Sequence, residues 1–306
     1  MHGTGSNLKD AGWRKMRILI VARYKQGRFA PFVAEQAEAL QQAGCEVVWF
    51  GVQGKGVSGY LRELPRLRKA IQSTRPDVVH AHYGLCGLLA NMATRRVPVV
   101  TTYHGSDMNV RFVRPFSRLA TGLSAWNIFV NGEWAKGRKA SVIPCGVKVV
   151  KGKGGETKSE RDKGRVLFAG AFDDAVKDAS LALEAMSGID AELVELKGYT
   201  REEVNRLLSE VRCLLMTSKS EGSPQIIKEA MVCGCPIVSV DVGDVKERIE
   251  GVNNCYIVPR EPQAIREAIR KVTAEQTNGQ EKIIADGLTN EQVANKIMDV
   301  YARVMR

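Results

Sequence analysis

The stretch RCLLMTSKSEGSPQIIKEAMVCGCPIVSVD (212–241) predicts a strand, a turn, a helix and a second strand. The two strand segments, 212–218 and 235–241, are apolar on both faces, and the helix is expected to begin near Pro224. Strands without a polar face lie in a parallel sheet that helices cover on both sides. A helical connection between strands is also typical of parallel pairs. This stretch therefore predicts an α/β fold built on a parallel sheet.

The same alternation of strands and helices runs along the rest of the chain and restarts once. In the first series, helices are predicted over 29–44, 60–75 and 87–95, and strands over 17–22, 46–51, 76–82, 97–104, 125–131 and 140–146. In the second series, helices are predicted over 179–186 and 200–210, and strands over 165–171, 191–196, 212–218, 235–241 and 255–259.

A composition shift separates the two series. The segment KVVKGKGGETKSERDKG (148–164) is rich in lysine and glycine and predicts a linker or long loop. The chain is thus predicted to form two Rossmann-like, doubly wound parallel-sheet domains, over 16–147 and 165–306, after a disordered leader over 1–15. The last helix of the second domain could pack back on the first. Ligands of such sheets bind beyond the carboxyl ends of the strands, so the expected site is the cleft between the domains.

Composition narrows the choice of partners. The 306 residues are 44% hydrophobic and 26% charged, with a formal net charge of +11. These values are typical of a soluble protein with sizeable cores. The positive charge suits nucleic acid, an anionic membrane or an anionic substrate, but no nucleic-acid-binding motif stands out, and no nucleic-acid partner is expected. The seven cysteines form no CxxC pair, which favours reduced, buried thiols over a metal site.

The turn in the quoted stretch carries residues that could bind a ligand. Ser223 is predicted as the N-cap of the helix and Pro224 as its first residue. Glu221 precedes this cap, Glu229 lies nearly two turns inside the helix, and Gly222 leaves room for a close approach. The N–H groups of such a helix start can hold an anionic or hydroxylated ligand. The alternative is that both glutamates are solvated charges that only balance neighbouring lysines.

Three segments together resemble one enzyme family. EGSPQIIKEAMVCGCPIVSVDVGDVKERI (221–249) resembles the donor-binding signature of the retaining glycosyltransferases of family 4, and DVVHAHYGLCGLLA (77–90) and VVTTYHGSDMN (99–109) resemble the N-terminal half of that family. The resemblance covers about residues 16–306. It implies the two-domain fold called GT-B, with acceptor-side and donor-binding domains in that order. It also implies a nucleotide diphosphate sugar as donor and transfer with retention of the anomeric configuration.

The resemblance further implies roles for individual residues. Glu229 would hold the ribose hydroxyls of the donor and Glu221 would lie at the transferred sugar, which suits carboxylates because their oxygens only accept hydrogen bonds. His104 would line the cleft close to the transferred bond, which makes His104 and Glu221 the predicted catalytic residues. Lys177 would neutralise the donor diphosphate. The donor-binding backbone would belong to Gly222, Ser223, Pro224 and Gln225.

One departure from the family pattern concerns the phosphates. The family usually has an arginine after the first strand of the donor domain, and Ala171 occupies that position here. Phosphate binding is therefore expected to depend on Lys177 and Gly27, with Arg23 or Arg28 as candidate further contacts. No metal and no cofactor are expected, because no metal-binding pair of aspartates stands out and a GT-B enzyme does not imply one.

The predicted function is that of a retaining glycosyltransferase of hexosyl type. It would move a sugar from a nucleotide diphosphate sugar to a sugar or lipid-linked glycan acceptor in the synthesis of a cell-surface polysaccharide such as lipopolysaccharide. The leaving phosphate itself would help to deprotonate the acceptor hydroxyl. Two alternatives stay open: a non-catalytic relative that binds nucleotide sugars, and a nucleotide-sugar epimerase of the same fold.

Two basic segments suggest where the protein acts. The helix predicted over 60–75 and the segment VRFVRPFSRLATGLSAW (110–126) place arginines near apolar and aromatic residues. Such surfaces can bind an anionic bilayer, or they can be solvated faces above core aromatics. The N-terminal residues lack the apolar segment of a secretory signal. The expected location is the cytoplasm, with peripheral attachment to the inner face of the membrane as a hypothesis.

Overall fold

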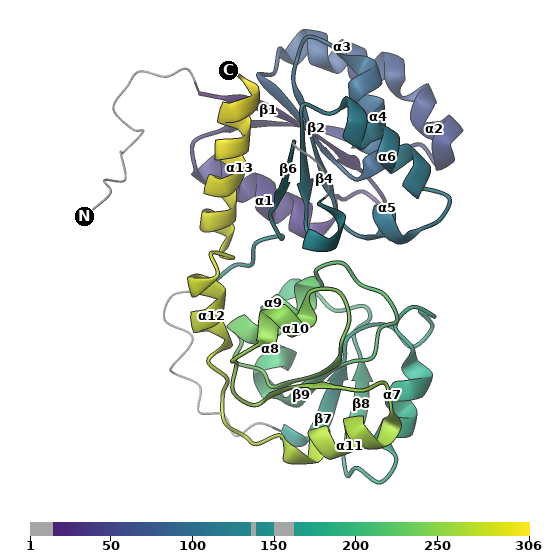
Figure 1. Ribbon diagram of the computed structural model, residues 1–306, viewed down its shortest axis with the longest axis vertical. Coiled ribbons are helices and arrows are strands. Elements are labelled where there is room, and N and C mark those ends of the chain that lie inside the picture. The colour runs from purple at the N-terminus through teal and green to yellow at the C-terminus, as the bar shows by residue number, and fades with distance from the viewer. Residues whose placement is uncertain (1–14, 136–138, 150–161) are drawn as a thin grey trace, which may run out of the picture.

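The computed structural model describes residues 15–135, 139–149 and 162–306. Two lobes, each built around its own parallel sheet, lie one above the other (Figure 1). The predicted fold class, two Rossmann-like parallel-sheet domains, is therefore confirmed. The predicted leader (1–15), apart from its last residue, and the middle of the predicted linker (148–164) lie outside the described residues.

The N-terminal lobe contains a six-stranded sheet in the order β2-β1-β3-β4-β5-β6. All of its neighbouring strands are parallel. All side chains of β3 and β4 and most of those of β1 are buried, as expected for strands covered on both faces. The strands are β1 (Arg17–Arg23), β2 (Glu46–Val52), β3 (Val78–His82), β4 (Val99–Tyr103), β5 (Trp126–Phe129) and β6 (Ala140–Val142).

Helices connect these strands and cover both faces of the sheet (Figure 1). The single helix predicted over 60–75 is wrong, because two helices, α2 and α3, meet at Glu63, one residue before the Leu64-Pro65 start of α3. Proline has no N–H for an intrahelical bond and fits only in the first turn of a helix. The helical elements are α1 (Pro31–Gln42), α2 (Gly56–Arg62), α3 (Leu64–Thr74), α4 (Gly84–Ala93), α5 (Ser106–Asn109), α6 (Arg114–Leu123) and the 3₁₀ turn η1 (Gly132–Trp134).

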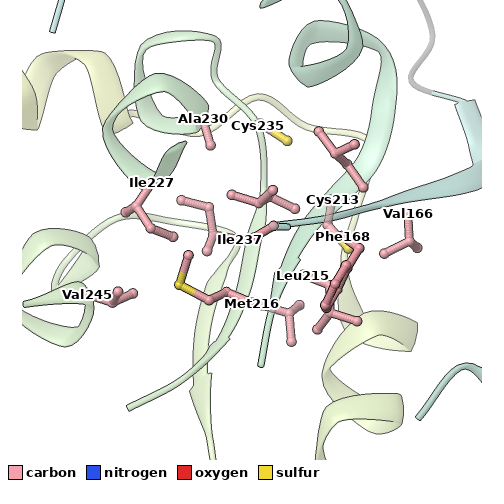
Figure 2. Close-up of a cluster of buried hydrophobic side chains, with 14 of the residues drawn as sticks. Val166, Phe168, Cys213, Leu215, Met216, Ile227, Ala230, Cys235, Ile237 and Val245 are labelled. Atoms are coloured by element: carbon pink, nitrogen blue, oxygen red, sulfur yellow. The ribbon is translucent and has the colours of Figure 1, made fainter. Parts of the chain in front are cut away.

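The C-terminal lobe contains a five-stranded parallel sheet in the order β11-β10-β9-β7-β8. Its first strand begins at Asp162, inside the segment predicted as a linker, because this strand pairs with Val211 of β9 before a bulge. Figure 2 shows apolar side chains from the central strands and from the helix after β9 gathered into one core. The strands are β7 (Asp162–Phe168), β8 (Glu192–Glu195), β9 (Val211–Met216), β10 (Ile237–Val240) and β11 (Cys255–Val258).

The C-terminal lobe contributes seven helices from the described residues. Two of them, α8 and α13, begin with a capping box in which a threonine and the residue three positions later exchange hydrogen bonds. The helices are α7 (Ala179–Met186), α8 (Arg201–Glu210), α9 (Gln225–Val232), α10 (Val245–Ile249), α11 (Pro262–Lys271), α12 (Gly279–Ala285) and α13 (Asn290–Val304).

The last helix returns to the first lobe. The chain crosses between the lobes where Val147 and Thr289 form a parallel bridge, and α13 then runs beside α1 along the N-terminal lobe (Figure 1). Its apolar face completes the core around β1 and α1. The core residues that it supplies are Val293, Ala294, Ile297, Val300 and Tyr301.

The seven cysteines are free thiols, five of them buried and two half-buried. Among the described residues, no helix is long and apolar enough to cross a membrane.

Candidate functional site

His104 lies in a tight turn at the carboxyl end of β4. The Asp107 carboxylate accepts hydrogen bonds from the backbone N–H groups of His104 at 3.0 Å and Gly105 at 2.9 Å, and from the N–H of Gly84 at 3.1 Å. These bonds explain the sequence His-Gly-Ser-Asp: Gly105 takes the positive φ of 113° that the turn requires, and Asp107 pairs the exposed N–H groups. Asp107 thus shapes the backbone of the turn and leaves the His104 ring free for other partners.

The half-buried ring of His104 stacks with two fully buried histidines, His82 and His80. The His82 and His104 rings stack with centroids 5.2 Å apart, and His80 stacks on the other face of His82 at 4.6 Å. His82 Nδ1 lies 3.0 Å from His104 Nε2, and the His104 Nδ1 lies 3.6 Å from the Cys145 thiol. Sequence analysis missed this stack, although the spacing His80-x-His82 on a strand already places both rings on one face of the sheet.

Burial controls the charge of the histidine stack. It lowers the pKa of His82 to about 3 and the pKa of His104 and His80 well below the ordinary value. Repulsion from neighbouring charged forms lowers the pKa of His80 and His104 further. All three rings are therefore neutral at pH 7. A neutral His104 can donate or accept one hydrogen bond at a sugar hydroxyl, but it carries no charge to a phosphate.

Lys177 and Glu221 form an ion pair on the donor-side lobe. The Lys177 ammonium lies 2.6 Å from the Glu221 carboxylate, and both side chains are largely buried. The alternative that Glu221 balances Lys219 is wrong, because Lys219 instead lies 3.5 Å from Asp178. The structure thus brings the predicted diphosphate ligand and the predicted sugar ligand together, each neutralising the other.

The start of α9 differs from its sequence prediction. Pro224 has an extended backbone and precedes the first helical residue, Gln225, and no side chain caps the helix. Ser223 is therefore one residue too early to be the N-cap, and its hydroxyl instead accepts a hydrogen bond from the Lys228 ammonium at 3.1 Å. Lys228 is fully buried, and burial lowers its pKa. A buried lysine beside the predicted donor loop was not predicted, since its neighbours in space come from distant segments.

The loop that carries Glu221 contacts the N-terminal lobe directly. The Asn131 side chain donates to the carbonyl of Gly222 at 3.0 Å, and the Gln225 side chain donates to the carbonyl of Gly146 at 2.6 Å. A Cβ atom at Gly222 would lie 3.1 Å from the His104 carbonyl and 2.9 Å from the Trp134 ring. The close approach that requires glycine at this position is therefore made by the other lobe of the protein.

Glu229 joins a second ion-pair group that also spans the two lobes. Arg201 at the start of α8 lies 2.6 Å from the Glu229 carboxylate and makes two further bonds of 3.0 Å to Glu35 on α1. Glu229 is 5% exposed, so the alternative of a solvated surface charge is wrong. Burial raises its pKa, and Arg201 opposes that rise. Arg201 was missed because nothing in the sequence marks it as a partner of Glu229.

Three further predicted residues lie around a pocket in the N-terminal lobe. This basic pocket has a volume of about 660 Å³ and is lined by residues that include Arg23 and Arg28, beside the turn at Gly27. Apart from Tyr199, its lining belongs to the N-terminal lobe, and neither Lys177 nor any residue of the 221–225 loop contributes. Arg23, Gly27 and Arg28 are thus separated from the Lys177–Glu221 pair, and their contact with donor phosphates stays a prediction.

Ala171 follows β7, where the predicted pattern has an arginine. The preceding residue, Gly170, packs against Lys177, since a Cβ atom at Gly170 would lie 2.5 Å from that side chain. The glycine thus gives the Lys177 side chain its path toward Glu221. No cation stands at position 171, and the buried ammonium of Lys228 donates to the Ser223 hydroxyl.

Two lobes, each with a parallel sheet, that meet through polar side chains have the two-domain architecture called GT-B. Two family models match this chain: the glycosyl transferase 4-like domain over residues 2–130 and the glycosyl transferases group 1 domain over residues 155–275. The chain belongs to the glycosyl transferases of group 1.

Individual relatives agree with this assignment. The chain is 27% identical over 246 residues to TuaC of Bacillus subtilis, whose name assigns it to teichuronic acid biosynthesis as a glycosyltransferase; the match covers 66% of this chain and 62% of that protein. The fold resembles sucrose-phosphate synthase of Thermosynechococcus elongatus, with a TM-score of 0.77, 16% identity and coverage of 95% and 99%. It also resembles Anabaena HepE in complex with UDP, with a TM-score of 0.71, 16% identity and coverage of 94% and 100%.

Proposed function

We propose that this protein is a retaining hexosyltransferase that transfers a sugar from a nucleotide diphosphate sugar to a sugar or lipid-linked glycan acceptor during the synthesis of a cell-surface polysaccharide. The observation that carries the proposal is the meeting of His104, from one lobe, with the loop of Glu221, from the other. Membership of the group 1 family and the UDP held by HepE, a protein of similar fold, support the class of donor.

The ion pairs of the site suit a donor that carries both phosphates and hydroxyls. Lys177 and Glu221 neutralise each other at 2.6 Å. A diphosphate would attract the Lys177 ammonium, and sugar hydroxyls would donate to the freed Glu221 carboxylate. Glu229 and Arg201 could separate in the same way when a ribose offers two hydroxyls to Glu229. In each exchange the freed carboxylate gains hydroxyl donors, so donor binding leaves no buried charge without a hydrogen-bond partner.

The proposed reaction uses the leaving diphosphate as the base. The bond between the anomeric carbon and the diphosphate oxygen breaks, the acceptor oxygen attacks the same face, and the acceptor proton passes to the departing phosphate oxygen. Lys177 stabilises the negative charge that grows on this phosphate. His104 is neutral and holds a sugar hydroxyl through Nδ1, because its thiol partner Cys145 is a weak hydrogen-bonding group that a hydroxyl can replace.

A thermal-shift screen with nucleotide diphosphate sugars tests the donor. A ligand that binds the native state raises the melting temperature by mass action, so at least one of these sugars should do so in the wild type and should do so much less in Lys177→Gln. Turnover of the same donor should fall in Glu221→Ala and His104→Ala. If no nucleotide sugar stabilises the wild type, the proposal is wrong.

A non-catalytic binding protein is the second candidate, because Ala171 removes a cation expected at the phosphates. The two candidates differ in turnover. A binding protein would be stabilised by the donor without releasing the nucleoside diphosphate in the presence of any acceptor, whereas the proposed transferase releases it.

We also propose that the protein attaches peripherally to the inner face of an anionic membrane through the segment 110–123. Phe112 is 86% exposed, and Leu119 and Leu123 on α6 are more than half exposed. Three arginines of this segment have no hydrogen-bond or ion-pair partner among the described residues: Arg111, Arg114 and Arg118. Exposed apolar groups beside unpaired cations are the features that hold a protein on anionic lipid.

The predicted helix 60–75 is a weaker candidate for the same role. Arg66 of α3 pairs with Glu63 and lies over the ring of Phe50, and Arg68 donates to the carbonyl of Met92. Arg66 and Arg68 therefore already have partners within the N-terminal lobe.

Sedimentation with anionic and neutral vesicles at low salt tests the membrane proposal. The wild type should sediment with the anionic vesicles, and the double variant Phe112→Ser and Arg114→Gln should not. Equal sedimentation of both proteins would contradict it.

A further inference from the structure

The basic pocket of the N-terminal lobe has no role assigned to it so far. Its rim carries Arg23, Lys25 and Arg28, and its walls include aromatic side chains such as Tyr60 and Tyr83. None of these three cations has a hydrogen-bond or ion-pair partner for its side chain among the described residues. The cations predicted or found beside the donor residues, Lys177 and Arg201, are by contrast already paired with carboxylates.

The turn that presents two of these cations is rigid. The backbones of Lys25 and Arg28 exchange two hydrogen bonds, of 3.0 and 3.1 Å, and the residues between them, Gln26 and Gly27, have φ angles of 51° and 77°. This is the geometry of a two-residue hairpin turn. The Tyr24 hydroxyl also donates to the Gly27 carbonyl at 2.7 Å. The turn therefore holds the Lys25 and Arg28 side chains beside each other without a charge partner.

The pocket has too few acidic side chains to neutralise these three cations. Of the described residues that line it, one, Asp107, is acidic. Its carboxylate already accepts three backbone N–H groups in the His104 turn. Arg23 is close enough to Tyr60 and Tyr83 to oppose the rise that burial causes in the pKa of both hydroxyls. Arg23, Tyr60 and Tyr83 all line the pocket.

The pocket also adjoins the reaction centre and the segment proposed to bind lipid. Asp107, which lines the pocket, is bonded to the backbone of His104, and Val110 and Val113 bring the pocket wall to the segment 110–123. A ligand here would reach the transferred bond from the N-terminal lobe. The donor residues Lys177, Glu221 and Glu229 line no part of it. The position therefore suits the acceptor.

We propose that the acceptor carries a negative charge close to its reacting hydroxyl, as a phosphate or a carboxylate, and that Arg23, Lys25 and Arg28 bind this charge instead of the donor phosphates. Guanidinium groups bind both anions in a bidentate manner, and the ammonium of Lys25 adds a third donor group. The aromatic walls offer faces for the sugar ring. The inference rests on the proposed function, because it names the chemistry of the second substrate of that same site.

Binding of small probes tests the inference on the full chain. The probes are methyl glucuronoside, which carries a carboxylate, glucose 6-phosphate, which carries a phosphate, and neutral methyl glucoside. At least one anionic probe should bind the wild type about tenfold or more tighter than the neutral probe, since a hydrogen bond to a charged group contributes about 1.5–3 kcal/mol. The affinities for the two anionic probes show whether the pocket prefers a carboxylate or a phosphate.

Charge-neutralising variants assign that preference to the pocket. It should disappear in the double variant Lys25→Gln and Arg28→Gln, whose side chains are exposed and support no other part of the fold. It should persist in the matched double variant Lys246→Gln and Lys271→Gln, which removes the same charge from exposed positions of the C-terminal lobe. It should also persist in Lys177→Gln, which removes the cation predicted for the donor.

Two results would overturn the inference. One is equal affinity of the wild type for all three probes. The other is loss of the preference in Lys177→Gln with retention in the Lys25 and Arg28 variant, which would assign the anion to the donor diphosphate. The thermal-shift screen with nucleotide sugars tests the proposed function separately. If nucleotide sugars bind but the probes show no preference, only the inference about the acceptor is contradicted. If no nucleotide sugar binds, the proposed function is contradicted, whatever the result with the probes.

Discussion

At the scale of single residues, the charged side chains of the site form ion pairs with one another. Glu229 is 5% exposed and lies 2.6 Å from Arg201. An isolated carboxylate could not stay ionised at such a depth, and the arginine opposes the rise of its pKa. A ligand that displaces Arg201 must therefore offer hydrogen-bond donors of its own. Vicinal ribose hydroxyls offer two.

The role of Glu229 can be measured with a matched pair of nucleotides. UDP should bind the wild type about tenfold or more tighter than 2′-deoxy-UDP, because the deoxy compound leaves a carboxylate oxygen without a donor. In Glu229→Gln the difference should shrink to less than about threefold, since a neutral amide forms weaker bonds. Calorimetric titration gives both affinities.

The control for this measurement is Glu202→Gln, an exposed glutamate beside Arg201 on α8. It should keep the wild-type difference. If Glu229→Gln discriminates between the two nucleotides as well as the wild type does, Glu229 does not hold the ribose.

The histidine stack predicts acid sensitivity of the fold. An unfolded histidine has a pKa of about 6.5, and burial lowers the pKa of folded His82 to about 3. The unfolded chain therefore binds more protons below pH 6.5, so the stabilisation by neutral His82 is complete above that pH and is lost as the pH falls toward about 3. The loss amounts to about 1.4 kcal/mol per pH unit for each such histidine. Asp107 acts in the opposite sense, because burial raises its pKa to about 6.

Chemical denaturation at pH 7.5 and pH 5.5 checks this expectation. The free energy of unfolding of the wild type should be lower at pH 5.5, because the three histidines of the stack outweigh the carboxyls whose pKa burial raises, which are Asp107, Glu229 and Asp244. In His82→Asn the decrease in the free energy of unfolding should be smaller by the contribution of one histidine. An equal decrease in both proteins would mean that His82 does not remain neutral in the fold.

Sequence could identify some residues of the site and not others, for a physical reason. Glu221, Glu229, Lys177 and His104 lie in local patterns that chemistry and family resemblance make recognisable. Arg201 and the other residues that complete the site come from segments far apart in the chain. Their partners are fixed only when the two lobes close, and no local periodicity records that contact.

At the scale of elements, the strands were predictable because their apolar runs are long and continuous. The ends of the helices were less predictable than the strands. Pro65 divides the predicted helix over 60–75 into two helices. The Ser223 hydroxyl accepts a hydrogen bond from Lys228 and does not cap α9. In both places a tertiary or local steric effect overrides an average preference. The start of β7 within a lysine- and glycine-rich segment has the same cause, since strand pairing with β9 outweighs composition.

The return of α13 to the first lobe has a polar as well as an apolar basis. The Tyr301 hydroxyl lies 2.5 Å from His80 Nδ1, and His80 Nε2 lies 2.7 Å from the Thr102 hydroxyl. In Tyr301→Phe the ring still packs, but a buried imidazole nitrogen loses its partner. The free energy of unfolding should fall by about 1–3 kcal/mol, as measured by chemical denaturation.

Tyr256→Phe is the matched control for this prediction. Tyr256 is half-buried in β11, and its hydroxyl has no hydrogen-bond partner among the described residues. Its replacement should change the stability by less than about 0.5 kcal/mol. Equal effects of the two substitutions would show that the His80–Tyr301 bond does not hold α13 on the N-terminal lobe.

At the scale of the whole molecule, side-chain contacts hold the two lobes together over the site. Glu35 of α1 and Arg201 of α8 form a two-bond ion pair between the lobes, and Asn109 donates to Ser220 across the same junction at 3.0 Å. The Glu35–Arg201 pair is partly exposed, so it adds little to overall stability. Its effect is expected on the balance between closed and open lobes.

Small-angle scattering at low salt can measure that balance. Glu35→Gln should increase the radius of gyration relative to the wild type, because Arg201 loses its partner on the other lobe. Glu38→Gln removes an exposed carboxylate from the same helix and should leave the radius unchanged. If Glu35→Gln is as compact as Glu38→Gln, the ion pair does not hold the lobes closed.

The stereochemistry of transfer tests the central claim most directly. Methanol as a surrogate acceptor gives a methyl glycoside, whose anomeric configuration does not interconvert in water and can be assigned by proton NMR. With the nucleotide diphosphate sugar that stabilises the protein best, the account predicts a methyl glycoside of the same anomeric configuration as the donor, formed by the wild type and much more slowly by Glu221→Ala. A product of inverted configuration, or equal rates in the two proteins, would contradict it.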